Sequence, residues 1–294
     1  MNYLESLKVL SLCPTLLNTH TKFYDFMFTI ASNHLKRTWG EMERQCCGVN
    51  LFSTEVLSPI THIRMIETDA NTIIPTMGNE IMTYLSARQH SFRRDASYLD
   101  NVDVTIAHRD EEVKWMQDIS YSQDFNGRTL FVAVDVMDRY YSKVDAIVSK
   151  MRVVSAACLW IANKLEDVDS DITSAHWWGK YNIDPFHVIK EEMVIMSTLN
   201  GVLNSPLTYE FVKWGAIQFH QNPEIQLDAL ELAEKTLFSL PLCAELASFV
   251  AAACLTVVCH RYGMESAELI VGTALSLDHG QVELMATQLV ELGF

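Results

Sequence analysis

Residues 129–141 read TLFVAVDVMDRYY, and residues 154–165 read VSAACLWIANKL. In both stretches apolar residues recur every three or four positions, which is the period of an α-helix with one buried face. The recurring residues are Leu130, Val134, Met137, Tyr141, Val154, Cys158, Ile161 and Leu165. Strand-like alternation is hard to find after about residue 79. The pattern therefore predicts an all-α protein.

Helix breakers divide the chain into two helical sets. Asn126-Gly127 precedes one predicted helix, and Asp184-Pro185 opens another with proline in its first turn. Ser205 is predicted to cap the first helix of the second set. Further helices are expected over 227–240, 246–259, 264–271 and 280–292, the second of them so apolar that others must surround it.

These breaks predict two tandem units of about five helices each. The first unit covers residues 78–203, with an extra helix over 80–89 at its start, and the second covers residues 204–294. Residues 1–77 form an N-terminal extension to which no function is assigned.

Composition limits the partners and the compartment. The formal net charge is −15, and phosphate backbones repel such a chain, so nucleic-acid binding is disfavoured. No apolar run has the length needed to span a bilayer, and the N-terminus lacks the pattern of a secretory signal. Seven cysteines in such a chain indicate a reducing compartment, with thiols used as small apolar side chains. We expect an intracellular protein without a membrane partner.

Sequence motifs for catalysis are missing. The chain has no GxxxxGK[ST], GxGxxG, HExxH or GxSxG pattern. The acidic run 166–171 alternates carboxylates as a calcium loop does, but Ile172 and Trp178 stand where that loop needs glycine and glutamate. We interpret the run as a solvated loop, with Asp171 or Thr173 capping the helix that follows. No metal or other cofactor is predicted.

Three segments in register resemble the cyclin box. Cyclins carry an arginine followed six residues later by tryptophan, here Arg109 and Trp115. Residues 129–141 are similar to the cyclin pattern TLxLAVxxxDRYL, and residues 156–167 to AAxxIAxKxEE. The likeness extends upstream to residues 80–85 and downstream to the core of a second box. The resemblance implies two tandem five-helix cyclin folds.

The resemblance also implies a function, that of a non-catalytic subunit that binds and activates a cyclin-dependent kinase in the nucleus. In cyclins, one lysine and one glutamate hydrogen-bond the backbone that flanks the kinase's regulatory helix, and Lys164 and Glu192 match them. Apolar residues cover the side of that helix. The expected apolar contacts are Leu165, Ile161, Met196 and Leu203, with Ile81 and Tyr84 from the preceding helix.

Other matching positions are structural in the family. Arg109 and Asp138 correspond to a buried ion pair between two box helices, and Trp115 and Arg139 belong to the same conserved framework of the family motif. Breaking such a pair leaves an uncompensated buried charge and costs about 3–5 kcal/mol.

Three departures from the family pattern alter the expected interfaces. Asp110-Glu111-Glu112 follows Arg109 where cyclins that dock RxL peptides have apolar residues. Residues 169–171 replace a double proline, and Gly201 replaces an aromatic residue. We therefore expect an altered kinase interface and no substrate docking through an RxL groove. Such divergence suits a transcription-type or a virus-encoded cyclin.

Two other functions are compatible with an all-α chain. A transcription factor with two cyclin folds would act as a protein- and DNA-binding adaptor, but it normally needs a basic face and often a zinc ribbon. The charge of −15 and the absence of CxxC pairs argue against it. An all-helical enzyme is the second alternative, and the acidic run is its only candidate site.

Overall fold

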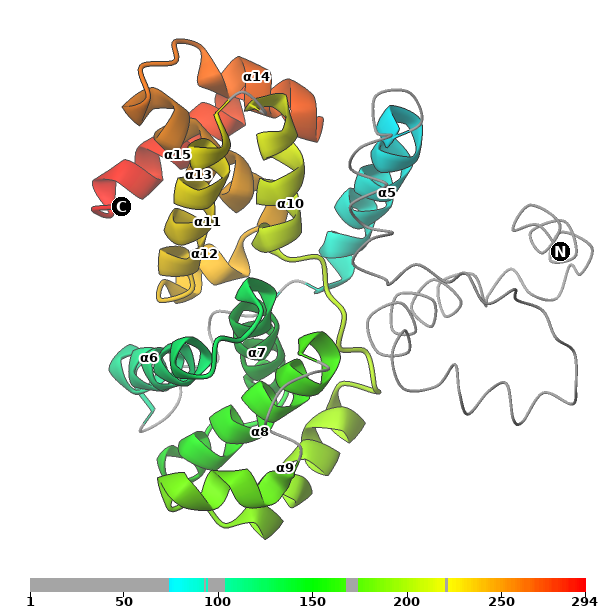
Figure 1. Ribbon diagram of the computed structural model, residues 1–294, viewed down its shortest axis with the longest axis vertical. Helices are drawn as coiled ribbons and strands as arrows, with labels where there is room; N and C mark the ends of the chain where they lie inside the picture. The colour runs from blue at the N-terminus through cyan, green and yellow to red at the C-terminus, as the bar shows by residue number, and fades with distance from the viewer. Residues whose placement is uncertain (1–73, 93, 95–103, 168–173, 220–221) are drawn as a thin grey trace, which may run out of the picture. The chain divides into compact units, whose positions relative to one another are not determined.

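The computed structural model of the chain describes residues 74–92, 94, 104–167, 174–219 and 222–294. Over these residues every regular element is a helix, so the predicted all-α class is confirmed (Figure 1). The α-helices are α5 (Ile74–Gln89), α6 (Ile106–Ser122), α7 (Gly127–Tyr141), α8 (Val148–Glu166), α9 (Pro185–Thr198), α10 (Thr208–Gly215), α11 (Pro223–Thr236), α12 (Leu240–Ala244), α13 (Ala247–Arg261), α14 (Ala267–Leu275) and α15 (His279–Glu291). The 3-10 helices are η2 (His90–Phe92), η4 (Ala175–Tyr181) and η5 (Ala216–Phe219).

The helix that precedes the box starts earlier than predicted. α5 begins at Ile74 and ends at Gln89, so its first residues belong to the range 1–77 that we assigned to an extension. The remainder of that extension, residues 1–73, lies outside the described residues.

α8 is the centre of the first helical set, because α6, α7 and α9 all pack against it. Its buried residues run from Val154 to Asn163 without interruption, as expected of a helix with neighbours on all sides. α7 and α9 begin where the sequence predicts. Asn126 accepts a hydrogen bond from a backbone N–H of α7, and Asp184 does the same for α9, with Pro185 in the first turn.

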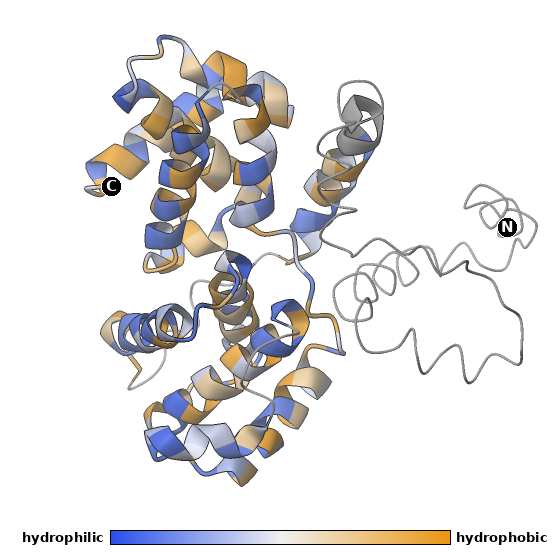
Figure 2. Ribbon diagram, in the orientation of Figure 1, coloured by the Kyte–Doolittle hydropathy of each residue, from blue (hydrophilic) through white to orange (hydrophobic). Residues whose placement is uncertain are grey.

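α13 is the centre of the second set. α10, α11, α14 and α15 pack against it, and every residue from Val250 to Cys259 is buried. The alanines at 251–253 leave room for the surrounding helices to approach closely. Figure 2 shows the contrast with α6, which is mostly hydrophilic.

The predicted cap of the second set is wrong. α10 begins at Thr208, and the buried Ser205 hydroxyl instead donates to Asp135 Oδ2 at 2.5 Å. The buried carboxylate of Asp135 needs hydrogen-bond donors, and Ser205 is one of them. At the start of α10, Glu210 accepts from the Leu207 N–H at 2.9 Å.

Two of the predicted helix boundaries also differ. The helix expected over 227–240 is α11, which begins earlier, at Pro223, and ends at Thr236, and α12 begins only at Leu240. Pro241 lies in the first turn of α12 and has no N–H with which to continue a helix from α11. The helix expected over 264–271 lies a few residues later, as α14.

The start of the acidic run is not solvated as predicted. Glu166 is paired with Arg128, and Asp167 Oδ1 accepts from the Asn126 N–H at 2.7 Å. Both carboxyl groups are partly buried, and burial raises the pKa of each despite these bonds. Residues 168–173, including the predicted caps Asp171 and Thr173, lie outside the described residues.

Polar and aromatic contacts join the two sets. Arg109 Nη1 on α6 donates to the Leu237 carbonyl after α11 at 2.9 Å. The ring centroids of Phe131 on α7 and Tyr209 on α10 lie 5.6 Å apart. All of the described residues belong to one compact unit.

The four cysteines in the described part of the chain are buried, in agreement with the predicted use of thiols in packing, and the sulfur of Cys243 also accepts from Arg109 Nη2 at 3.5 Å. Cys158, Cys243, Cys254 and Cys259 form no disulfide. Burial raises the pKa of Cys254 to about 12 and of Cys259 to about 11, so these thiols stay protonated at neutral pH. No helix in the described part of the chain is long and apolar enough to cross a bilayer.

Candidate functional site

The fold places Lys164 and Glu192 side by side. Lys164 lies in the last turn of α8, and Glu192 lies in the middle of α9. Val188 and Ile195 of α9 are fully buried, which fixes the rotation of that helix against α8. Glu192 follows Val188 by four residues and therefore lies at the edge of the buried face.

The two charges form an ion pair that Trp160 completes. Lys164 Nζ binds Glu192 Oε1, and Trp160 Nε1 donates to Glu192 Oε2 at 2.8 Å. Lys164 Nζ also lies 4.8 Å from the centroid of the Trp160 ring, in cation–π contact. The side chains of Lys164 and Glu192 are 40% and 23% exposed, so a partner can reach both. Sequence reasoning did not identify Trp160.

The predicted apolar contacts differ in accessibility. Ile161 and Leu165 are buried in the core of the chain, at 2% and 7% exposure. Met196 and Leu203 are partly buried. Of these four residues, Met196 and Leu203 therefore offer the accessible apolar surface.

An exposed apolar stripe on α9 extends this surface and was missed by the sequence analysis. Phe186, Ile189 and Met193 are 66%, 46% and 68% exposed. Their spacing of three and four residues puts them on one face of the helix. The sequence signal for this stripe was the helical period. That period places Val188 on the buried face of α9, and Ile189 and Met193 each lie one sequence position beyond a residue of that face.

Ile81 and Tyr84 are not brought together with the pair on α8 and α9. Both lie on α5, where Ile81 is 45% exposed and Tyr84 is partly buried. α5 is fastened to the second set through Gln89, whose Nε2 donates to Ser248 Oγ at 2.9 Å and whose Oε1 accepts from the Ser248 N–H at 3.1 Å.

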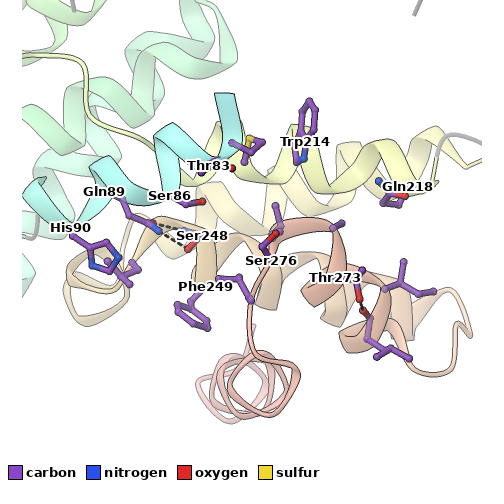
Figure 3. Close-up of a pocket in the computed structure, with 17 residues that line it drawn as sticks. Thr83, Ser86, Gln89, His90, Trp214, Gln218, Ser248, Phe249, Thr273 and Ser276 are labelled. Carbon is purple, nitrogen blue, oxygen red and sulfur yellow. Dashed lines mark hydrogen bonds between the residues drawn. The ribbon is translucent and has the colours of Figure 1, made fainter. Parts of the chain in front are cut away.

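A groove of about 900 Å³ lies between α5 and the second set (Figure 3). Thr83 and Ser86 line it from α5, Trp214 from α10 and Thr273 from α14. Its described lining contains no lysine, arginine, aspartate or glutamate. Within the described residues, no group of three or more histidine, cysteine, aspartate or glutamate side chains is arranged to hold a metal ion.

Arg109 and Asp138 form a fully buried, bidentate ion pair between α6 and α7. Arg109 Nε donates to Asp138 Oδ1 at 2.9 Å, and Nη2 donates to Oδ2 at 2.8 Å. Both side chains have 0% exposure. Because Arg109 also binds the Leu237 carbonyl, this pair holds the first set together and ties it to the second.

A second buried cluster surrounds Asp135. Arg139 Nη1 donates to Asp135 Oδ2 at 3.0 Å, and Arg94 Nε donates to Oδ1 at 3.0 Å. Burial by itself raises the pKa of Asp135, but the attraction of Arg94 and Arg139 and the bond from Ser205 together lower it below its usual value.

Trp115 is covered by Arg152, which sequence reasoning also missed. The Arg152 guanidinium carbon lies 4.5 Å from the Trp115 ring centroid, and Arg152 Nε donates to Glu112 Oε2 at 2.9 Å. The Glu112 side chain is only 8% exposed. On η4, Trp178 and Tyr181 pack against Trp115 at centroid distances of 6.0 and 5.9 Å. The Arg152 guanidinium therefore occupies the face where cyclins that dock RxL peptides have an apolar groove.

A comparison with protein families matches the part of the chain that carries these helices. The family model for the cyclin N-terminal domain matches residues 80–204, from α5 through α9. The chain therefore carries a divergent cyclin box over these residues.

Its relatives are themselves cyclins. The cyclin-box protein is 24% identical over 192 residues to G2/mitotic-specific cyclin-A of Hydra viridissima, which covers 64% of this chain. It is 26% identical over 182 residues to human G2/mitotic-specific cyclin-B3, which covers 62% of this chain. It spans 46% of the first relative's length and 13% of the second's.

A solved structure supports the fold of the cyclin-box protein. The X-ray structure of a viral cyclin from herpesvirus saimiri superposes with a TM-score of 0.62. The match covers 72% of this chain and 97% of the viral cyclin, at 16% sequence identity.

Proposed function

We propose that the chain is a non-catalytic regulatory subunit that binds and activates a cyclin-dependent kinase through α8 and α9. The observation that carries this proposal is the partly exposed Lys164–Glu192 pair beside the apolar stripe of Phe186, Ile189 and Met193. An exposed group of large apolar residues next to fixed charges is typical of a protein-binding surface.

The chemistry of this face suits the ends of a helix. A helix leaves unpaired N–H groups at its start and unpaired carbonyls at its end. Glu192 can accept from the former, and Lys164 can donate to the latter. The apolar stripe, together with Met196, would cover the side of the same helix. This arrangement is the one that the cyclin resemblance implies for a kinase's regulatory helix.

The energy balance favours exchange of the internal pair for a partner. An ion pair as exposed as Lys164–Glu192 contributes about 0.2–1 kcal/mol. Two charge-assisted bonds to a helix, in an interface that excludes water, contribute about 1.5–3 kcal/mol each. The pair can therefore open on binding, and the free chain holds both groups ready.

We further propose that residues 78–203 form the kinase-binding box and that residues 204–294 form a second, supporting cyclin fold. Ile81 and Tyr84 on α5 would form a separate contact with the kinase. The names of two relatives, both G2/mitotic-specific cyclins, favour a cell-cycle role over a transcriptional one. The cyclin resemblance implies action in the nucleus.

Substrate docking through an RxL groove is not part of the proposed function. A bound leucine side chain must displace water from an apolar trough to gain about 1.5–3 kcal/mol. In this chain Arg152 covers Trp115 and pairs with the nearly buried Glu112. A peptide would have to separate that pair and leave the carboxylate without a partner. Substrates would then be selected by another surface or by location.

A binding titration tests the proposed function. Purified chain is titrated against individual purified cyclin-dependent kinases, and the kinase that binds is tested with Lys164→Ala and Glu192→Ala. Loss of about 1.5–3 kcal/mol corresponds to a rise in Kd of roughly ten- to 150-fold.

The matched control is Lys235→Ala on α11. Lys235 forms an ion pair with Glu231 at 2.7 Å on the surface of the second set. Its removal should change Kd by less than about twofold, since it deletes an exposed pair far in sequence from α8 and α9. Equal affinities for the wild type, Lys164→Ala and Glu192→Ala would show that the interface lies elsewhere.

A further inference from the structure

Trp160 has features that packing alone does not explain. It lies on α8 one turn before Lys164 and is 7% exposed. Its indole N–H donates to Glu192 Oε2 at 2.8 Å, while its ring face contacts Lys164 Nζ at 4.8 Å. A single side chain therefore contacts both charged groups of the proposed kinase-binding face.

The geometry points to Trp160 as a positioning residue for kinase binding, an inference that rests on the proposed function. The two oxygens of Glu192 have different partners, Lys164 for Oε1 and Trp160 for Oε2. When Lys164 turns toward the kinase, Oε1 becomes available, but Trp160 still holds Oε2. The carboxylate thus keeps its orientation when the partner arrives.

The ring supports Lys164 in the same way. Residues four apart in a helix lie on one face, so the Lys164 side chain extends across the indole. A long flexible side chain that is already held loses less conformational freedom on binding. Trp160 would therefore raise affinity without touching the kinase.

Trp160→Phe separates the hydrogen bond from the packing. Phenylalanine keeps an aromatic ring at this buried position and removes the indole N–H. Because the Glu192 side chain would lose the hydrogen bond that preorganises it, we expect Kd for the kinase to rise by about three- to tenfold. The matched control is Trp178→Phe, since Trp178 is fully buried and its indole nitrogen makes no hydrogen bond within the described residues.

A double-mutant cycle distinguishes positioning from a structural role. If Trp160 acts through Glu192, Trp160→Phe weakens kinase binding when residue 192 is glutamate. In the Glu192→Ala background the same substitution causes no further loss of affinity. An equal loss of affinity in both backgrounds would overturn the inference, because it would mean that the indole acts through the fold.

The remaining outcomes are also decisive. If Glu192→Ala weakens binding and Trp160→Phe does not, the inference is wrong while the proposed function stands. If Glu192→Ala itself has no effect, the proposed function fails first. Should Trp160→Phe not fold, 3-benzothienylalanine at position 160 replaces the N–H by sulfur in a ring of the same size, and the same comparison is made with it.

Discussion

Asp138→Asn tests the fully buried ion pair between α6 and α7. Asparagine has nearly the same shape as aspartate, so the substitution removes a charge with little change in packing. Arg109 then retains its positive charge at 0% exposure. Separating one partner from a buried ion pair costs about 3–5 kcal/mol, because the remaining charge is not compensated.

The contacts that Arg109 keeps place the expected loss in the free energy of unfolding near the lower end of this range. Arg109 keeps its bond to the Leu237 carbonyl at 2.9 Å, and Asp110 lies 3.7 Å from its Nη1. The Asp110 side chain is 39% exposed, so solvent weakens its attraction for the guanidinium. We therefore predict a loss of about 3 kcal/mol in the free energy of unfolding.

Urea unfolding followed by circular dichroism at 222 nm measures this loss. The control is Asp118→Asn on α6, where Asp118 pairs with Lys114 at 2.8 Å and both side chains are more than half exposed. Such a pair contributes about 0–1 kcal/mol. If Asp138→Asn lowers the free energy of unfolding no more than Asp118→Asn does, the Arg109–Asp138 pair does not hold α6 and α7 together.

Two further predictions concern pH and substrate docking. Because the folded state lowers the pKa of Asp135, its stabilising contribution is present above the ordinary aspartate pKa and is lost as pH falls through the lowered value. Asp135→Asn should therefore be much less stable than the wild type at pH 7, with the difference shrinking below about pH 4, and a difference independent of pH would contradict this. A fluorescent RxL peptide should not bind the wild type at micromolar concentration, because Arg152 covers Trp115. Micromolar binding that is lost in Trp115→Ala would refute the closed face.

Local signals in the sequence predicted much of the fold. Asp184-Pro185 begins α9 because both the cap and the proline act within one helical turn. The alanine-rich run at 246–259 predicted the central helix α13, because a helix that is apolar on every side must be surrounded by others. The cyclin resemblance identified Lys164 and Glu192 as a pair of interest, and the structure places them in contact.

Long-range partners could not be predicted in the same way. Serine is a favoured capping residue, but the Ser205 hydroxyl donates instead to Asp135, seventy residues earlier. Trp160 and Glu192 are 32 residues apart, and their contact depends on how α8 and α9 rotate against each other. Arg152 likewise meets Glu112 only after α6 packs on α8.

Kinase activation is the most direct test of the central claim. A purified cyclin-dependent kinase that binds the chain is assayed for phosphoryl transfer to a peptide substrate as the chain is titrated in. We predict saturable activation by the wild type, with Glu192→Ala reaching the same maximum only at roughly ten- to 150-fold higher concentration. Kinase activity that stays at its basal level at saturating wild-type chain, while an established cyclin activates the same preparation, would contradict the proposed function.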